Sequence, residues 1–220
     1  MPKKITQKRL ARLREVVERR QLDFTVVLEN VHDPHNISAV MRSCEAVGMA
    51  EIYVLHTEAQ LQERYLELGH KSSAGTRKWL DVRYFTDLEA CVKAVRTRYA
   101  KIYATHLATH ALSLYELDLT QSVALWFGNE HAGVSEAALA HADGNFLIPQ
   151  MGMVQSLNIS VACAVSVYEG LRQRQAKGFY GAHNPAVPQQ QQALLADYVR
   201  RHEHGLTGKK VWAQGTKQPE

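Results

Sequence analysis

The sequence predicts an α/β protein in which a mostly parallel sheet is covered by helices on both faces. Short, strongly apolar runs alternate with segments of helical spacing, a pattern typical of strands buried on both faces of a sheet. The chain has 220 residues, of which 45% are hydrophobic and 22% are charged, as in an ordinary globular protein. This length corresponds to one domain with small extensions, and no apolar run reaches the ~18 residues of a membrane span.

The elements follow from local patterns taken in chain order. Residues 5–20 form a helix, because Leu10, Leu13, Val16 and Val17 fall on one stripe. Apolar runs predict strands at 24–28, 52–55, 79–85, 101–105, 123–127 and 146–148. Helical spacing predicts helices at 36–47, 87–98, 135–141 and 158–174.

Polar residues and glycines mark the helix ends. Asn36 or Ser38 is expected to cap the second helix, which ends at Gly48, and Asp87 is expected near the N-cap of the next helix. Ser156 or Asn158 is expected to cap the long helix that begins at 158.

Two stretches have weak patterns. Residues 56–78 are the least regular and contain the basic loop HKSSAGTRK. After Gly181 the chain is expected to turn through NPAVPQQQQ, form a short helix at 193–204, and end in a poorly ordered tail. The predicted organisation is an N-terminal helical arm (1–21), one domain (22–176) and a C-terminal extension (177–220).

The formal charge of +4 is unevenly distributed. Residues 1–21 carry eight basic and two acidic side chains, and residues 170–220 carry eight basic and three acidic ones. Residues 22–169 carry ten basic and seventeen acidic side chains, so an acidic body lies between two basic ends. The N-terminal helix therefore fits two interpretations, a solvated charged face or an arm that binds phosphates.

Several function classes lack their motifs. The first predicted strand is not followed by G-x-G-x-x-G, and the G-x₄-G segment at 128–133 is followed by Val134 instead of a phosphate-binding lysine. The histidines are scattered and lack the spacing of a metal site, so we expect no bound metal. The three cysteines (Cys44, Cys91 and Cys163) lack the spacing of a metal site or a disulfide framework, so we expect them to be reduced, buried thiols. Without an apolar signal segment at the N-terminus, the expected location is the cytoplasm.

Three segments place unusual polar residues at predicted strand ends: ENVHDPHNIS (29–38), LWFGNEHAG (125–133) and IPQMGMVQSLN (148–158). Open α/β sheets bind ligands beyond the carboxyl ends of their strands. The apolar third loop suits a small planar ligand such as adenine. Arg42 follows the first segment on an otherwise apolar helix, so we expect it to be partly buried beside an anionic partner.

The segments NVHDPHNISAVMRSCEAVG, LWFGNEHAGVSEAALAHAD and IPQMGMVQSLNISVACAVSVYEGLRQRQ resemble, in order, the three motifs of the SpoU branch of the SPOUT RNA 2′-O-methyltransferases. Within that branch, residues 10–180 resemble the tRNA (guanosine-18-2′-O)-methyltransferases of the TrmH type. The resemblance implies a C-terminal trefoil knot, a homodimer, S-adenosylmethionine as cofactor and tRNA as substrate. The alternatives are another tRNA position, rRNA, or an RNA-binding relative without activity.

The resemblance also implies roles for individual residues. The cofactor pocket would be lined by Thr105, Gly128, Ile148 and Leu157, and the catalytic and structural positions would be Asn36, Arg42, Glu130, Ser156 and Asn158. The arginines expected to contact the tRNA backbone are Arg9, Arg12, Arg19, Arg20, Arg172 and Arg174.

Physical chemistry limits some of these roles. Because a guanidinium is effectively always protonated, Arg42 suits a phosphate clamp and alkoxide stabiliser better than a base. Glu130 is either catalytic or a buried acid bonded by backbone N–H groups, and Asn158 is expected to be a helix cap. Gln150 and Asp33 depart from the usual motifs, which have an apolar and a basic residue at these positions.

Overall fold

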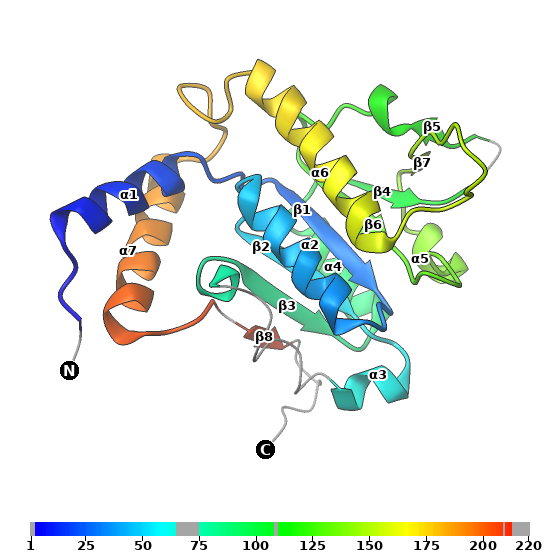
Figure 1. The fold of residues 1–220 in the computed structure, drawn as a ribbon, viewed down its shortest axis with the longest axis horizontal. Helices are drawn as coiled ribbons and strands as arrows, with labels where there is room; N and C mark the ends of the chain where they lie inside the picture. Colours follow the sequence, from blue (N-terminus) through cyan, green and yellow to red (C-terminus); the bar gives the residue numbers. More distant parts are fainter. Residues whose placement is uncertain (1–2, 65–74, 108–109, 209, 213–220) are drawn as a thin grey trace.

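The centre of the protein is an eight-stranded sheet in which all the observed strand pairs are parallel (Figure 1). The computed structural model describes residues 3–64, 75–107, 110–208 and 210–212. The strands are β1 (Phe24–Glu29), β2 (Glu51–Leu55), β3 (Asp81–Phe85), β4 (Lys101–Thr105), β5 (Leu112–Ser113), β6 (Val123–Phe127), β7 (Gly144–Leu147) and β8 (Lys210–Trp212). Their order across the sheet is β5-β7-β4-β6-β1-β2-β3-β8.

Helices cover both faces of the sheet, as the sequence predicts. The helices are α1 (Gln7–Glu18), α2 (Pro34–Ala46), α3 (Ala59–Arg64), α4 (Leu88–Arg96), α5 (Glu136–Leu139), α6 (Ile159–Ala176) and α7 (Pro188–His204), with 3₁₀ turns η1 (Thr76–Lys78) and η2 (Leu114–Glu116). In Figure 1, α2 and α6 cross in front of the sheet while α4 lies behind it.

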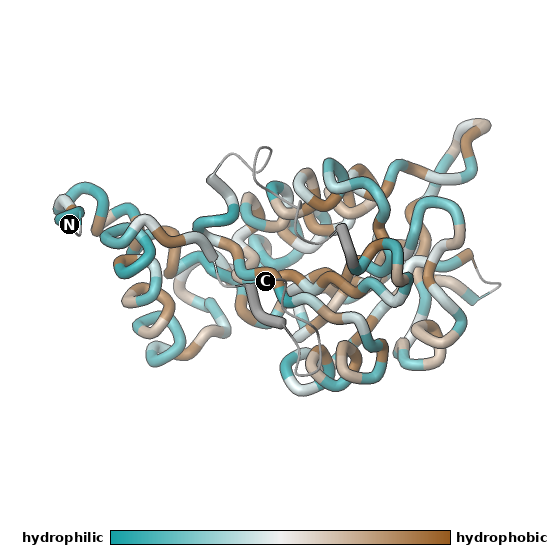
Figure 2. The backbone as a smooth tube through the Cα atoms, turned by 90° about the horizontal axis from the view of Figure 1, so that it is seen from below, coloured by the Kyte–Doolittle hydropathy of each residue, from teal (hydrophilic) through white to brown (hydrophobic). Residues whose placement is uncertain are grey.

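Alternate residues of each central strand enter two different cores. In β6, Val123, Leu125 and Phe127 pack on the α2 and α6 side, whereas Ala124 and Trp126 pack on the α4 and α5 side. All five residues of β6 are buried, and Figure 2 shows the most apolar backbone running through the middle of the molecule. Burial on both faces explains why these strands appear in the sequence as continuous apolar runs.

The helix ends follow the predicted chemistry with one exception. Asp87 caps α4 and Asn158 caps α6, as expected. The N-cap of α2 is Asp33, which accepts a hydrogen bond from the His35 amide, so the prediction of Asn36 or Ser38 is wrong. Pro34 at the first helical position fixes the start of α2 there, since its missing N–H costs nothing at that place.

The C-terminal part is more regular than predicted. α7 begins at Pro188, so the glutamine run is helical and not part of a turn. Residues 210–212 form β8, which pairs with β3, although this stretch was expected to be poorly ordered. Residues 213–220 of the expected tail, and 70–74 of the basic loop, lie outside the described residues.

The two basic ends of the chain lie together. α1 packs against α7 at one end of the molecule (Figure 1), and Leu13, Val17 and Tyr198 form a small core there. Trp79, just after η1, packs on this core with its ring 5.2 Å from that of Tyr198. The N-terminal arm is therefore anchored by apolar contacts to the C-terminal extension.

Candidate active site

Four loops lie along the carboxyl edge of the sheet, because parallel strands all end on the same side. They follow β1, β4, β6 and β7, and three of them hold the polar segments that the sequence singles out. The strands β7, β4, β6 and β1 are neighbours, so the three segments converge although about 100 residues separate the first from the second.

The turn after β6 folds tightly on itself. Asn129 and Gly133 exchange backbone hydrogen bonds of 3.0 and 2.9 Å, and a Cβ on Gly128 would lie 2.0 Å from the carbonyl of Gly133. The Asn129 side chain accepts hydrogen bonds from two amides of this turn and donates one to the carbonyl of Asn30 at 2.9 Å. Glycine at 128 is therefore a steric requirement, and Asn129 joins the turn to the loop after β1.

A cavity of about 430 Å³ lies between the turn after β6 and the loop after β7. Its volume is within the range of ~300–1,000 Å³ typical of small-molecule sites. The four residues predicted to line a cofactor pocket, Thr105, Gly128, Ile148 and Leu157, all line this cavity. Glu130 and Ser156 from the predicted catalytic set line it as well. Other residues of the two polar segments also line it, namely Phe127, Asn129, His131, Gln150 and Gln155, as do His106, Leu107 and Phe146 from outside these segments.

Three predicted catalytic residues form a hydrogen-bonded chain beside the cavity. Asn158 Nδ2 donates to Asn36 Oδ1 at 3.2 Å, and Asn36 Nδ2 donates to Glu130 Oε1 at 2.7 Å. Asn158 also caps α6, since its Oδ1 accepts from the Ser160 amide at 2.9 Å. The chain of bonds holds the Glu130 carboxylate beside the start of α2.

The structure excludes one of the two roles left open for Glu130 and contradicts the expected partial burial of Arg42. Glu130 is exposed and bonded to a side-chain amide, so it is not a buried acid satisfied by backbone N–H groups. Arg42 is also exposed, because it lies on the outer side of α2, whereas Val40, Met41 and Cys44 face the sheet.

The six predicted RNA-contacting arginines divide into two groups. Arg12 and Arg19 are exposed on α1, Arg9 is half-buried there, and Arg172 on α6 is 69% exposed while bonded to Glu169. Arg20 and Arg174 are 1% and 0% exposed. The prediction that these two contact RNA is therefore wrong for the folded chain.

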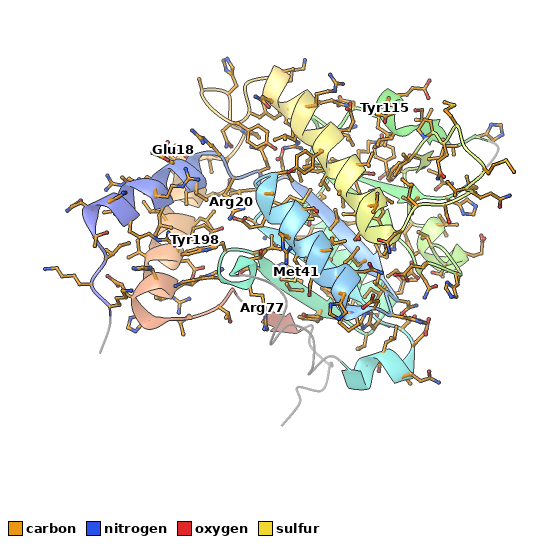
Figure 3. The ribbon with its side chains drawn as sticks, in the orientation of Figure 1. Glu18, Arg20, Met41, Arg77, Tyr115 and Tyr198 are labelled. Atoms are coloured by element: carbon orange, nitrogen blue, oxygen red, sulfur yellow. The ribbon has the colours of Figure 1, made fainter. Side chains whose placement is uncertain are left out.

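Both buried arginines tie separate segments together. Arg20 lies between the α1–α7 pair and the body of the protein (Figure 3), where it bonds Glu45 Oε1 at 2.8 Å and the Met49 carbonyl at 2.7 Å. Arg174 bonds Asp23 at 2.6 Å and the carbonyls of Leu119 and Gln121 at 2.8 and 2.7 Å. Their charges are neutralised inside the protein.

A cluster of positive groups surrounds Trp79 on the α1–α7 pair. The Arg9 guanidinium and the Lys78 ammonium each lie 5.3 Å from the centre of the Trp79 ring. Burial, followed by the charges of Arg9 and Lys3, lowers the pKa of Lys78. Within the described part of the chain, Lys3, Arg9 and Lys78 form no direct ion pair, although Glu203 belongs to the same group of charges around His202.

The three cysteines are free and buried, as the sequence predicts. Burial, together with a hydrogen bond to Cys163, raises the pKa of Cys44. Among the described residues, no group of three or more His, Cys, Asp or Glu side chains is arranged to hold a metal ion. Within the same residues, no helix is both long enough and apolar enough to cross a membrane.

Comparison with known proteins gives consistent matches. Residues 23–168 match the model of the SpoU rRNA Methylase family. The chain is 43% identical over 197 residues to the tRNA (guanosine(18)-2′-O)-methyltransferase of Thermus thermophilus, covering 89% of this chain and 98% of that protein.

Two solved structures extend the match to three dimensions. The TrmH/SpoU tRNA modifying enzyme of A. aeolicus superposes with a TM-score of 0.78 at 35% identity, covering 89% of this chain and 96% of that one. The methyltransferase AviRb of Streptomyces viridochromogenes, in complex with AdoMet, has a TM-score of 0.62 at 28% identity, covering 71% and 60%.

Proposed function

The chain belongs to the SpoU rRNA Methylase family, and we propose that it methylates the ribose 2′-oxygen of guanosine 18 in tRNA, using S-adenosylmethionine. The observation that carries this proposal is the cavity at the carboxyl edge, with the Asn158–Asn36–Glu130 chain of hydrogen bonds beside it. The relative named for guanosine 18 matches over 98% of its own length and 89% of this chain, whereas a relative named for 23S rRNA matches over 59% of its length and 69% of this chain. That coverage favours tRNA over rRNA as substrate.

The cavity fits S-adenosylmethionine. Phe127, Ile148 and Leu157 supply apolar walls for the adenosine part, and the Glu130 carboxylate offers a partner for positive charge. When bound, the cofactor supplies a methyl group that is already electrophilic. The task left to the protein is to hold the ribose oxygen in line with that group and to accept its proton.

Different residues around the cavity perform the separate parts of this task. Glu130 lines the cavity and is oriented by Asn36, so it is placed to accept a proton from the 2′-hydroxyl. Arg42 lies two turns further along α2 with its side chain exposed, where it serves as a clamp for a backbone phosphate and stabilises developing negative charge. Ser156 contributes to the cavity wall beside Asn158.

The tRNA backbone binds the α1–α7 pair. The cations around Trp79 and the exposed Arg12 and Arg19 form the contact surface, and Arg172 on α6 continues it. Cations occupy positions near the Trp79 ring, so the surface suits phosphates better than stacked bases. Such contacts give salt-dependent affinity and no sequence readout.

The enzyme acts as a homodimer with a knotted C-terminal region. Val161 and Tyr168 on α6 and the 95–100% exposed Met151 and Met153 supply an apolar surface for a second copy. For the knot, the support is that Gln173 and Arg174 of α6 bond the carbonyls of Leu117, Leu119 and Gln121 within the connection from β4 to β6. We place both the enzyme and its tRNA substrate in the cytoplasm.

The test is methyl transfer from labelled S-adenosylmethionine to an unmodified tRNA transcript, with mapping of the methylated nucleotide. Label at guanosine 18 is expected, with none on a transcript carrying another base there, and Arg42→Ala should abolish it. Incorporation into rRNA alone would contradict the substrate, and no incorporation into either RNA would overturn the proposed activity.

A further inference from the structure

Asn30, the residue directly after β1, has a backbone conformation that residues with a side chain rarely adopt. Its φ is +49°, and among the described residues no other residue except glycine has a positive φ. In this left-handed region the Cβ of an L-residue comes close to the following carbonyl oxygen, and asparagine tolerates this better than most residues. Backbone strain of this kind clusters at functional sites, where the surrounding structure holds it in place.

Contacts with the end of β2 hold Asn30 in this conformation. Its backbone amide donates a hydrogen bond to the carbonyl of Leu55 at 2.8 Å. Its side chain pairs with Thr57 in both directions, since Nδ2 donates to Thr57 Oγ1 and Oδ1 accepts from the Thr57 amide, each at 2.9 Å. Because the amide and the side chain are both held, the Asn30 carbonyl keeps one direction.

The Asn30 carbonyl faces the turn after β6. It accepts a hydrogen bond from Asn129 Nδ2 at 2.9 Å. Asn129 Oδ1 in turn accepts from the amides of His131 and Ala132 at 2.7 and 3.1 Å. One end of this side-chain amide therefore bonds Asn30, and the other end bonds the main chain just after Glu130. The main chain on both sides of Glu130 is thus tied to the end of β1.

The carboxylate of Glu130 has a second support from the same stretch of chain. Asn36 lies near the start of α2, and its Nδ2 donates to Glu130 Oε1 at 2.7 Å. The segment from β1 into α2 therefore fixes Glu130 at two points, at its main chain through Asn129 and at its carboxylate through Asn36. A change in the direction of the Asn30 carbonyl would move the first point relative to the second.

We propose that Asn30 is a positioning residue that places the Glu130 carboxylate for proton acceptance by acting through Asn129. The inference rests on the proposed function, which gives Glu130 that role. Asn129 and Glu130 line the cavity, whereas Asn30 is not among the described residues that line it. The effect of Asn30 therefore reaches the reaction through its neighbours, and its pairing with Thr57 is the means by which the end of β2 supports the site.

The experiment is a double-mutant cycle that measures single-turnover methyl transfer to a tRNA transcript, with enzyme and S-adenosylmethionine saturating. Asn30→Ala removes both side-chain hydrogen bonds to Thr57 and disfavours the positive φ. With Glu130 intact, this change should slow transfer by about 10- to 100-fold, because a small misplacement of a reacting group has effects of this size. In the Glu130→Gln background, where the carboxylate is already absent, the same change should slow transfer by less than about 2-fold.

A second variant and a matched control complete the design. Asn30→Gly removes the same hydrogen bonds but adopts a positive φ without strain, so it serves if the alanine variant does not fold, and it should show the same dependence on Glu130. The control is Asn184→Ala, which removes hydrogen bonds from another half-buried asparagine, to the carbonyls of Glu18 and Arg20 at the α1 end of the molecule. It should leave the single-turnover rate unchanged in both backgrounds, and urea unfolding shows that each variant is folded.

An equal slowing by Asn30→Ala in both backgrounds would show that Asn30 supports the loops in general, and it would overturn the positioning role. An unchanged rate in the folded Asn30 variants, or an equal slowing by Asn184→Ala, would do the same. If Glu130→Gln alone keeps the wild-type rate, the proposed role of Glu130 is wrong. If the wild-type protein methylates no tRNA, the proposed function itself is wrong, so the failures can be told apart.

Discussion

Arg172 and Arg174 are two residues apart on α6, and the structure predicts opposite effects for their replacement by alanine. Arg174 makes four hydrogen bonds, to Leu119, Gln121, Gln21 and Asp23, with none of its side chain exposed. Truncation leaves two main-chain carbonyls and a partly buried carboxylate without their donor. Breaking a buried ion pair in this way costs about 3–5 kcal/mol.

The assay is urea unfolding followed by circular dichroism at fixed protein concentration. With a slope of about 2–3 kcal/mol/M for a protein of this size, the Arg174→Ala midpoint should fall by about 1–2.5 M. Arg172→Ala should lower the midpoint much less, because its side chain is 69% exposed and its ion pair with Glu169 is of the solvent-screened kind that contributes about 1 kcal/mol or less. Its tRNA affinity should instead weaken, with the salt dependence reduced by about one phosphate contact.

The result that would refute this reasoning is an Arg174→Ala variant with the wild-type midpoint and weakened tRNA binding. It would mean that Arg174 leaves its internal partners and reaches RNA, as the sequence resemblance implies. A midpoint for Arg172→Ala as low as that of Arg174→Ala would equally contradict the reasoning, because the Arg172 side chain is 69% exposed.

Three further predictions concern the site and its supports. Glu130→Gln removes the charge but keeps an acceptor for Asn36, so kcat at saturating cofactor and tRNA should fall by roughly 100-fold. Calorimetry should also show weaker cofactor binding, because the variant lacks the carboxylate that faces the positive charge of the cofactor. A kcat near that of the wild type would exclude Glu130 as the base. Gly128→Ala places a methyl group 2.0 Å from the carbonyl of Gly133 and should abolish cofactor binding. The control is Gly181→Ala, which should bind the cofactor normally because only one atom lies near its Cβ, at 3.8 Å. Normal cofactor binding by Gly128→Ala would contradict the tight turn. Burial, followed by the charge of His32, lowers the pKa of His56 to about 4, so the unfolded chain binds the proton first as pH falls below about 6.5. Lowering the pH from 7.5 to 5.5 should therefore cost about 1 kcal/mol of stability in urea titrations, and the same loss in His56→Gln would show that another group is responsible.

The positions of the main strands and helices could be predicted because their signals are local. Burial on both sheet faces requires continuous apolar runs, and capping residues such as Asp87 and Asn158 act within one turn. β8 was missed because its pairing with β3 joins residues more than 120 positions apart, and three residues carry little pattern of their own. The start of α7 was missed because proline and glutamine were taken as turn residues, although proline is favoured at a first helical position.

Only those residues of the candidate site that lie in recognisable sequence motifs could be predicted from the sequence. The sequence by itself determined the α/β class and the three polar segments, since these depend on periodicity and on where strands end, and its resemblance to the SpoU motifs implied four of the residues that line the cavity. Only the tertiary structure decided what each charged or polar side chain does. Arg174 bonds Gln21, which is 153 residues away, while Arg172 is largely exposed and bonds only Glu169, on the preceding turn of the same helix. The energy of a charge depends on its surroundings, and segments far apart in the sequence supply those surroundings.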